Sequence, residues 1–312
     1  MLEGINLYKV FESGFISKRR IVAVDGVNLK IDEGETLVLV GESGSGKSTL
    51  GRMLLLLIKP TIGEVHFNGL NLTRIKAKEL RKIRQKMQLI PQHPEDALDP
   101  RWRIQDSIAE PLRIHNRMNK SEEKETIYKL VEMVGLQEEH LTRYPHELSG
   151  GELQRAVIAR AITLNPKFIV CDEPTSMLDV SVQASIINLL LDLQNKLGLA
   201  YLFITHDLEV AKAIADRIAV MYCGQIVEEG IKIFEEPLHP YTKMLVKSLG
   251  INGTFNTGVE FKVELKQDIQ NISINQKGCK FYHLCPERTD VCLKQPETIK
   301  INGRKVKCWL YN

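Results

Sequence analysis

The chain has 312 residues, of which 43% are hydrophobic and 26% charged, and its formal net charge is +3. This length favours one large domain with a smaller second one, and the composition is ordinary for a globular protein. The nearly neutral charge gives no support for nucleic-acid binding. Apolar runs such as Met53 to Ile58 are too short to cross a bilayer, and the first residues lack the apolar core of a signal peptide. We therefore expect a cytoplasmic protein.

Residues 1–35 predict short strands joined by turns. Ile21 to Leu29 combines β-branched residues with Asp25-Gly26, a dipeptide typical of a turn or hairpin. Phe11 is an aromatic residue that can stack on an adenine ring, and a place in the core or at a sheet edge is an equally good interpretation.

The stretch from Thr36 to Leu50 carries the strongest motif of the chain. A short apolar run that predicts a buried strand is followed by Gly41, Gly44 and Gly46, and Lys47-Ser48-Thr49 then opens a predicted helix. This is G-x-x-x-x-G-K-[ST] between a strand and a helix, the setting of a phosphate-binding loop. A glycine-rich turn that binds nothing is the alternative interpretation.

The chemistry of such a loop follows from its residue types. Glycine lets backbone N–H groups turn inward around a phosphate, and the helix that follows presents its unpaired N–H groups to the same anion. Lys47 would reach the β- and γ-phosphates, and the Ser48 hydroxyl would bind Mg²⁺.

Three segments follow before the next long helices. Gly63 to Leu72 predicts a hairpin with Asn68-Gly69 at its turn. Arg74 to Gln88 is rich in Lys and Arg, and we favour a solvated helix over a nucleic-acid patch because Leu80, Ile83 and Met87 recur at helical spacing. Leu89 to Gln92 predicts a short strand that runs into a loop.

Residues 96–147 predict helices, among them Lys120 to Val134, whose Ser121-Glu122-Glu123 suits a helix N-terminus. Leu148 to Glu152 then leads into a helix predicted from about Leu153 to Leu164. Small residues at a helix N-terminus can bind an anion, although taken alone such a segment is usually a turn.

An acidic pair follows the next apolar strand, Phe168 to Cys171. Asp172 suits a Mg²⁺ ligand, and Glu173 suits a base that orients water. A predicted helix, Ser181 to Leu197, and a strand, Tyr201 to Ile204, place His206 at a strand end, where ligands of α/β sheets bind. Residues 218–222 and 225–229 predict further strands.

In this order, these motifs resemble the ATPase subunit of ATP-binding cassette (ABC) transporters. The matching positions are Phe11 (or Phe15) for the adenine-stacking aromatic, Gly41 to Thr49 for Walker A, Gln92 for the Q-loop, Leu148 to Glu152 for the signature loop, Asp172 and Glu173 for Walker B with the catalytic glutamate, Ser176 to Asp179 for the D-loop, and His206 for the switch histidine. The signature loop departs from the family in ending on Glu where Gln is usual. The resemblance covers residues 1–245. It implies an α/β P-loop NTPase (RecA-like) core, an antiparallel β-subdomain and a helical signature subdomain over about residues 93–163.

The resemblance also implies a site. ATP contacts would come from Phe11, Gly41, Ser43, Gly44, Ser45, Gly46, Lys47, Ser48, Thr49, Ser149, Gly150, Gly151 and Asp179. Mg²⁺ would be held by Ser48, Gln92 and Asp172, and catalysis would use Lys47, Gln92, Glu173 and His206. Family geometry implies a head-to-tail pair of ATPase subunits, in which the signature loop of one contacts the ATP of the other.

Within the family, Val40 to Gly46, Asp179 to Gln183 and His239 to Thr242 resemble the peptide-uptake branch, as does the context of Gln92. This implies an ATP-hydrolysing importer subunit for di- or oligopeptides. The implied partners are an identical or paralogous ATPase subunit, two permease subunits and an extracytoplasmic substrate-binding protein, without nucleic acid. It implies a peripheral place on the cytoplasmic face of the membrane. Nickel or oligosaccharide uptake, and a non-transport ABC ATPase, are the alternatives.

Four of the six cysteines lie in residues 246–312, predicted as a separate C-terminal extension: Cys279, Cys285, Cys292 and Cys308. Their spacing lacks the C-x-x-C pair of common zinc folds, yet four thiolates in a short polar tail can close around one centre. The peptide branch has a similar tail, which implies a [4Fe–4S] cluster. Zinc and unligated thiols remain open. Cys171 and Cys223 lie in strand-like runs and are predicted to be core residues.

Overall fold

A computed structural model describes residues 1–13, 19–115, 118–248 and 278–312. The chain divides into two compact units, and each is described by itself. The first unit consists of Met1, Ile31–Thr36 and Arg74–Ile204, and the second of Leu2–Lys30, Leu37–Thr73 and Thr205–Asn312.

Three parallel strands form the sheet of the first unit: β6 (Met87–Ile90), β7 (Phe168–Asp172) and β8 (Ala200–Thr205). Met87 lies opposite Phe168, and Phe168 lies opposite Ala200. Every residue of β7 and β8 is buried, which explains why both strands read as nearly continuous apolar runs. The strands predicted at 168–171 and 201–204 are confirmed.

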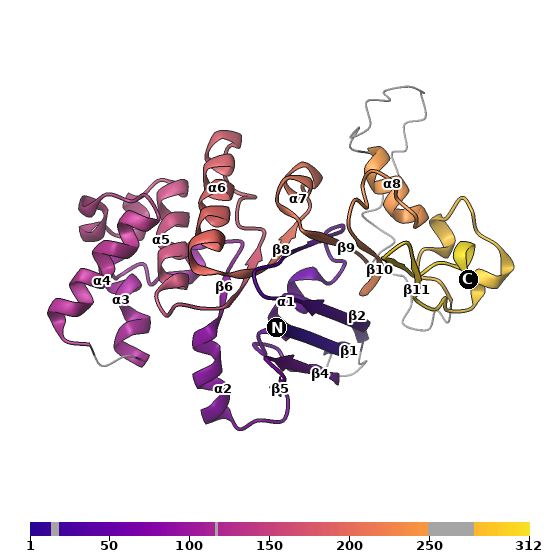
Figure 1. Cartoon of the computed structure of the whole chain (residues 1–312), viewed down its shortest axis with the longest axis horizontal. Coiled ribbons are helices and arrows are strands. Elements are labelled where there is room, and N and C mark those ends of the chain that lie inside the picture. Colours follow the sequence, from indigo (N-terminus) through magenta and orange to yellow (C-terminus); the bar gives the residue numbers. More distant parts are fainter. Residues whose placement is uncertain (14–18, 116–117, 249–277) are drawn as a thin grey trace. The chain divides into compact units, whose positions relative to one another are not determined.

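Helices make up most of the first unit, and α3, α4 and α5 pack against one another (Figure 1). The α-helices are α2 (Ala77–Ile83), α3 (Ile104–His115), α4 (Lys120–Met133), α5 (Gly150–Ile162) and α6 (Val180–Leu197). Short 3-10 helices lie at Arg84–Lys86, Pro94–Ala97, Glu138–Thr142 and Pro145–Glu147. The helical segment predicted over residues 96–147 is confirmed.

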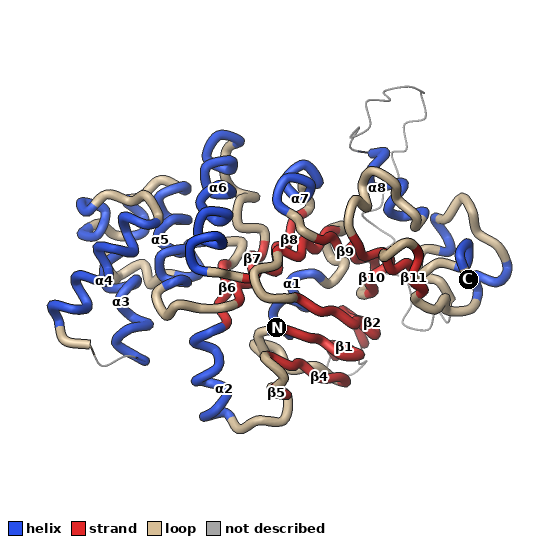
Figure 2. The backbone as a smooth tube through the Cα atoms, in the orientation of Figure 1, coloured by secondary structure: helices blue, strands red, loops and turns tan. Residues whose placement is uncertain are grey.

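The second unit contains a four-stranded sheet in the order β2-β1-β4-β5 (Figure 2). Its strands are β1 (Leu2–Ser13), β2 (Arg19–Ile31), β4 (Ile62–Phe67) and β5 (Leu70–Asn71). β4 and β5 form the predicted antiparallel hairpin, and Asn68 and Gly69 take φ values of 50° and 78° at its turn.

The second unit also holds a run of strands in the order β11-β12-β10-β9-β3. These are β3 (Thr36–Val40), β9 (Arg217–Tyr222), β10 (Gln225–Gly230), β11 (Ile299–Ile301) and β12 (Arg304–Val306). β3 pairs parallel with β9, and the other neighbours are antiparallel. The C-terminal strands β11 and β12 thus continue a sheet that begins beside the phosphate loop.

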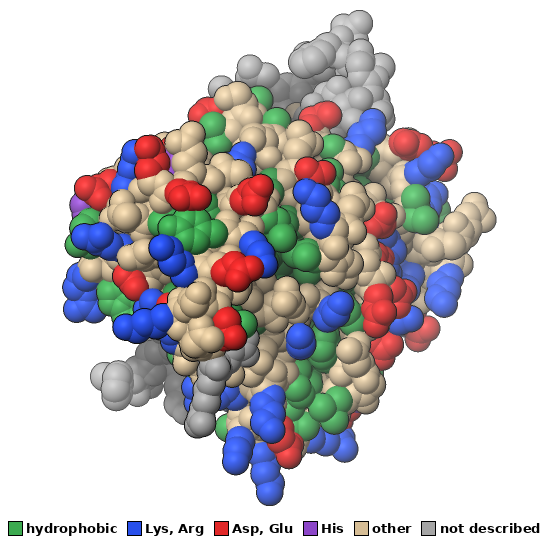
Figure 3. Space-filling model, turned by 60° about the vertical axis from the view of Figure 1, so that its left-hand side comes forward, with side chains coloured by type: hydrophobic (Ala, Val, Ile, Leu, Met, Phe, Trp, Pro, Cys, Tyr) green, Lys and Arg blue, Asp and Glu red, His purple; other side chains and the backbone are tan. Residues whose placement is uncertain are grey.

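The α-helices of the second unit are α1 (Lys47–Leu54), α7 (Leu208–Ile214) and α8 (Pro240–Ser248), with 3-10 helices at Tyr282–Leu284, Asp290–Leu293 and Trp309–Tyr311. No helix among the described residues is both long and apolar enough to span a membrane. Basic and acidic side chains are interspersed on the face shown in Figure 3.

Several predicted local structures are wrong. Asp25-Gly26 makes no hairpin: β2 runs through it, with Gly26 at φ 68° beside the Tyr8 hydroxyl. The basic segment does form a solvated helix, α2, which buries none of its side chains, but the helix is short and the buried stripe predicted from Leu80, Ile83 and Met87 is wrong because Met87 belongs to β6. The place predicted for Cys223 in a strand is also wrong: it lies with Gly224 in the turn between β9 and β10 at φ 44° and is half-buried, whereas Cys171 is a core residue of β7.

Candidate active site

Two glycines of the phosphate loop lie directly against backbone carbonyls. Gly41 has φ 155°, and a Cβ there would come within 2.2 Å of the Met221 carbonyl oxygen in β9. Gly46 has φ 104°, and a Cβ there would come within 2.1 Å of the Ala23 carbonyl oxygen in β2. The loop therefore requires glycine at both positions for space as well as for backbone conformation.

Lys47, the first residue of α1, folds back over this loop. Its Nζ donates to the carbonyl oxygens of Gly41 at 2.7 Å and Glu42 at 2.8 Å. Lys47 is 5% exposed, so its ammonium group is buried and is stabilised by these two loop carbonyls. The neighbouring Ser45 Oγ is buried and has no hydrogen-bond partner within the described part of the chain. An orphaned polar atom inside a cationic loop fits a site for an oxyanion.

The acidic pair lies at the end of β7 in the first unit. Asp172 is 2% exposed, and Glu173 follows with φ 50°, an uncommon value for a residue with a side chain. The Glu173 N–H donates to the Ile204 carbonyl at 3.0 Å, which ties this conformation to β8. Gln92 Nε2 donates to Glu173 Oε2 at 3.1 Å, so the structure brings the predicted Q-loop glutamine and the predicted base together.

The signature loop forms the N-terminus of α5, three residues earlier than the predicted helix start. Ser149 caps the helix, and Glu152 Oε2 accepts from the Ser149 N–H and hydroxyl, both at 2.8 Å. Hydrogen bonds from Ser149 hold the pKa of Glu152 below its usual range. The glutamate that departs from the family pattern thus completes a capping box. A Cβ on Gly151 would come within 2.6 Å of Val182, so the loop packs closely on α6.

The D-loop leads from β7 into α6. Asp179 caps α6 by accepting from the Ser181 and Val182 N–H groups at 3.1 and 3.0 Å. Its pKa is lowered, chiefly by a hydrogen bond from the Ser181 hydroxyl. Next to it, the apolar side chains of Met177 and Val180 are 61% and 83% exposed. Asp179, predicted as an ATP contact, therefore also caps α6, a role that the sequence pattern did not suggest.

His206 follows β8 and is exposed, and the next residue, Asp207, caps α7. Phe11 lies on β1 and is 39% exposed, with Lys9 Nζ 5.1 Å from its ring centre, whereas Phe15 lies outside the described residues. The phosphate loop and His206 belong to the second unit, and Gln92, Asp172 and Glu173 belong to the first. Their convergence on one nucleotide stays a prediction.

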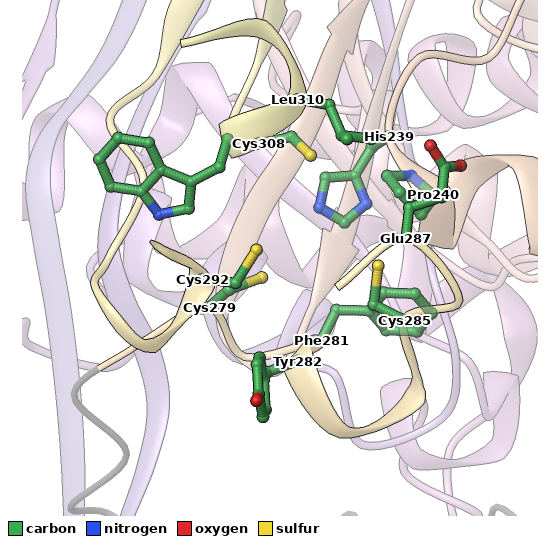
Figure 4. A pocket seen from close by; sticks show the side chains of 11 residues that line it. His239, Pro240, Cys279, Phe281, Tyr282, Cys285, Glu287, Cys292, Cys308 and Leu310 are labelled. Atoms are coloured by element: carbon green, nitrogen blue, oxygen red, sulfur yellow. The ribbon is translucent and has the colours of Figure 1, made fainter. Parts of the chain in front are cut away.

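The four C-terminal cysteines line one pocket together with His239 and Phe281 (Figure 4). The Cys279 N–H donates to the Cys292 carbonyl at 2.9 Å, and burial raises the pKa of Cys279 to about 11. Within the part of the chain that the structure describes, no three His, Cys, Asp or Glu residues form a group that could hold a metal ion. The pocket therefore holds the four thiol donors that the predicted iron–sulfur cluster would need, but they are not arranged as metal ligands.

Comparison with known proteins places these features in a family. Residues 24–176 match the family described as ABC transporter, and residues 227–292 match the oligopeptide/dipeptide transporter C-terminal region. The oligopeptide transport ATP-binding protein AppF of Bacillus subtilis (strain 168) is 40% identical over 100% of this chain and 97% of its own length. The dipeptide transport ATP-binding protein DppF of Escherichia coli (strain K12) is 39% identical over 99% of this chain and 94% of its own.

Solved structures agree on the fold. The ATP-binding cassette MJ0796, solved as a dimer in a post-hydrolysis state with ADP and Pi, is 34% identical with a TM-score of 0.67 and covers 73% of this chain and 97% of its own. That likeness confirms the α/β ATPase cassette predicted from the motifs. The chain therefore belongs to the ATP-hydrolysing subunits of ABC transporters, in the branch that carries the oligopeptide/dipeptide transporter C-terminal region.

Proposed function

We propose that this chain hydrolyses ATP to energise the uptake of di- or oligopeptides through partner permease subunits. The observation that carries the proposal is the phosphate loop, in which Lys47 donates to two loop carbonyls and the buried Ser45 hydroxyl has no hydrogen-bond partner among the described residues. The substrate class rests on the similarity to AppF and DppF, which extends through the C-terminal region. The chain would act on the cytoplasmic face of the membrane with an extracytoplasmic substrate-binding protein.

Each residue of the site has a part in this reaction. Lys47 and the loop amides would bind the β- and γ-phosphates, and Ser48, Gln92 and Asp172 would hold Mg²⁺, which would neutralise phosphate charge. Glu173 accepts a proton from the attacking water, and His206 stabilises charge on the γ-phosphate. Phe11 stacks on the adenine ring. The signature loop, residues 148–152, completes the site of a second ATPase subunit.

The hydrogen bond between Gln92 and Glu173 connects hydrolysis to transport. Because the amide of Gln92 donates to the carboxylate that would polarise water, a movement of the Q-loop reorients that carboxylate. Residues 93–103, which follow Gln92, contain the 40% exposed Trp102 and would contact a permease subunit. A change at the permease would thereby alter the position of the base.

The change Glu173→Gln tests the assignment of the base. We expect nucleotide binding to remain, a closed dimer to accumulate with ATP, and hydrolysis to fall by at least about a hundredfold, because the amide cannot accept the proton. Phosphate release and gel filtration with ATP measure both effects. Glu132→Gln, an exposed change on α4, is the control and should leave turnover unchanged. Near-normal turnover in Glu173→Gln removes Glu173 from the role.

The partners are tested by purification from membranes. We expect the tagged chain to co-purify with two permease chains and with either itself or a paralogous ATPase subunit. The substrate class is tested by ATPase stimulation with the binding protein and a dipeptide, a longer peptide, nickel or an oligosaccharide. Stimulation by nickel or sugar alone, or co-sedimentation with ribosomes or DNA in place of permeases, contradicts the proposal.

We also propose that the C-terminal cysteines take up an iron–sulfur cluster. Support comes from the four thiols on one pocket, a donor set suited to such clusters. Because no three of these groups are preassembled, binding would have to draw the thiols together. Iron analysis after anaerobic purification, with the visible spectrum near roughly 400 nm, tests this, and Cys285→Ser should remove the signal. Zinc in place of iron, or no metal, rejects the cluster.

We retain the division into an ATPase domain, residues 1–245, and an extension, residues 246–312. The pairing of β12 with β10 indicates that the extension folds onto the ATPase domain, and α8 crosses the proposed border.

A further inference from the structure

One peptide group of the phosphate loop is held from both of its ends. The carbonyl oxygen of Gly41 accepts from Lys47 Nζ at 2.7 Å. The N–H of the same peptide, that of Glu42, donates to the hydroxyl of Tyr241 at 3.2 Å. Because the carbonyl and the N–H of a trans peptide point in opposite directions within one plane, fixing the N–H also fixes the carbonyl that binds the lysine.

The Tyr241 hydroxyl is aimed at the loop by a rigid surrounding. Its ring is completely buried, with its centre 4.6 Å from that of Tyr222 in β9 and 5.6 Å from that of Phe281. The hydroxyl also hydrogen-bonds the side chain of Glu42. A buried aromatic ring with a satisfied hydroxyl is a low-entropy way to hold one polar atom in place.

The segment before Tyr241 is anchored as well. The Tyr241 N–H donates to His239 Nδ1 at 3.1 Å. The N–H groups of Leu238 and His239 donate to the carboxylate of Glu228, at 3.0 and 2.9 Å, and Glu228 is a fully buried residue of β10. The sequence His-Pro-Tyr-Thr at residues 239–242 therefore connects β10, through Glu228, to the phosphate loop, through Glu42.

From this geometry we propose that Tyr241 is a positioning residue for ATP hydrolysis: through the Gly41–Glu42 peptide it holds Lys47 where the β- and γ-phosphates bind. The C-terminal region thereby takes part in building the nucleotide site, since Phe281 packs against the same ring. The proposal rests on the ATPase activity and is independent of the transported substrate.

The change Tyr241→Phe removes the hydroxyl and keeps the ring. Loss of one such hydrogen bond frees the peptide to rotate, and we expect Kd and KM for ATP to rise about three- to tenfold with kcat within about twofold. Calorimetry with MgATP and MgADP on the full chain, and steady-state hydrolysis, measure this. The loss should be larger for ATP than for ADP and absent for adenosine, because Lys47 would contact the β- and γ-phosphates and no other part of the nucleotide.

Tyr201→Phe is the matched control. The Tyr201 ring is also buried, and its hydroxyl donates to the Leu190 carbonyl at 2.9 Å, so this change removes the hydroxyl of a buried tyrosine whose partner is Leu190 and not the segment 238–242. Both variants should unfold at similar temperatures, and only Tyr241→Phe should lose affinity. Unchanged KM, an equal loss in Tyr201→Phe, or an equal loss for adenosine overturns the proposal.

A second variant keeps the proposal testable if Tyr241→Phe does not fold. Phe281→Leu retains the Tyr241 hydroxyl and loosens the ring that supports it. We expect a smaller rise in the KM for ATP in the same direction, with kcat again retained. A variant that is folded and shows no change in KM contradicts a role for this packing.

Discussion

At the scale of single residues, two carbonyl oxygens restrict two positions of the phosphate loop to glycine. Met221 and Ala23 present these oxygens to Gly41 and Gly46 at distances that leave no room for a side chain. A methyl group at either position would overlap with backbone atoms, which cannot relieve the overlap by changing rotamer as a long side chain can. The loop thus depends on strands that lie far from it in the sequence.

This contact gives a prediction for Gly46→Ala. We expect it to lower the free energy of unfolding by roughly 3–5 kcal/mol, because a positive φ and a steric overlap add together, and to abolish ATP binding. Gly34→Ala is the control: Gly34 also has a positive φ, 70°, but no atom of the described residues would lie within 4 Å of a Cβ there, so only about 1–2 kcal/mol should be lost. Urea unfolding measures both, and equal losses would show that the Ala23 carbonyl does not matter.

The motif residues could be predicted from the sequence because glycine, lysine and carboxylate spacing carries the chemistry directly. The contacts that support them could not. Tyr241 was only part of a family resemblance, since nothing local shows that residues 199 positions apart in the chain, Glu42 and Tyr241, share a hydrogen bond. Likewise the sequence suggested Asp179 as an ATP contact and did not show that its carboxylate caps α6.

At the scale of elements, the capping box of α5 determines how the signature loop is presented. Its glutamate accepts from both the Ser149 N–H and the Ser149 hydroxyl, and the Ser149 hydroxyl accepts from the Glu152 N–H in return. The signature loop and the first turn of α5 are therefore held together by this capping box.

We predict that Glu152→Ala lowers the free energy of unfolding by about 1 kcal/mol at neutral pH, while Glu152→Gln, which can still accept both hydrogen bonds, loses less. Since the folded-state pKa of Glu152 lies below the ordinary 4.5, its stabilisation is present above that value and is lost as pH falls through the lowered pKa. The gap between the wild type and the alanine variant should thus close in acid, and that between glutamine and alanine should stay constant. Urea titrations at several pH values measure this, and a pH-independent gap for the wild type would be the contrary result.

Elements with a local signal were predicted well, as the Asn68-Gly69 hairpin shows. Asp25-Gly26 was wrong because its glycine serves a close approach of Tyr8, whose hydroxyl would lie 2.8 Å from a Cβ, and makes no reversal of the chain. The start of α4 predicted at Lys120 is confirmed, and the feature that the prediction missed is the capping residue, because Asn119 forms a full capping box with Glu122.

At the scale of the whole molecule, the C-terminal region of the second unit is built into the sheet that carries the phosphate loop. β12 pairs with β10, and Glu229 of β10, 2% exposed, forms ion pairs with Arg217 and with Lys305 of β12 at 3.0 Å. Ile299 to Ile301 in β11 alternates apolar and polar residues, and Asn302-Gly303, with φ values of 48° and 78°, joins β11 to β12 as a hairpin turn. The sequence therefore carried a local signal for this hairpin, which the prediction of a polar tail around a metal centre missed.

The ion-pair cluster gives a prediction for Glu229→Ala. Removing the shared carboxylate leaves Arg217 without its buried partner, and we expect a loss of about 3 kcal/mol in the free energy of unfolding. Lys305→Ala, at a more exposed lysine, should cost less than about 1 kcal/mol. Chemical denaturation gives both values. Comparable losses would mean that the burial of Glu229 is unimportant.

The pairing of β12 with β10 and the packing of Phe281 against both Tyr222 and Tyr241 are non-covalent contacts that hold residues 278–312 in the second unit. A protein produced as two fragments, 1–248 and 278–312, should reassemble into one particle and elute together, with the smaller fragment acting as a donated strand. The larger fragment by itself would carry a bare sheet edge and an uncovered tyrosine pair, and such surfaces bind to copies of themselves. We therefore expect fragment 1–248, produced alone, to associate with itself, and added fragment 278–312 to prevent this.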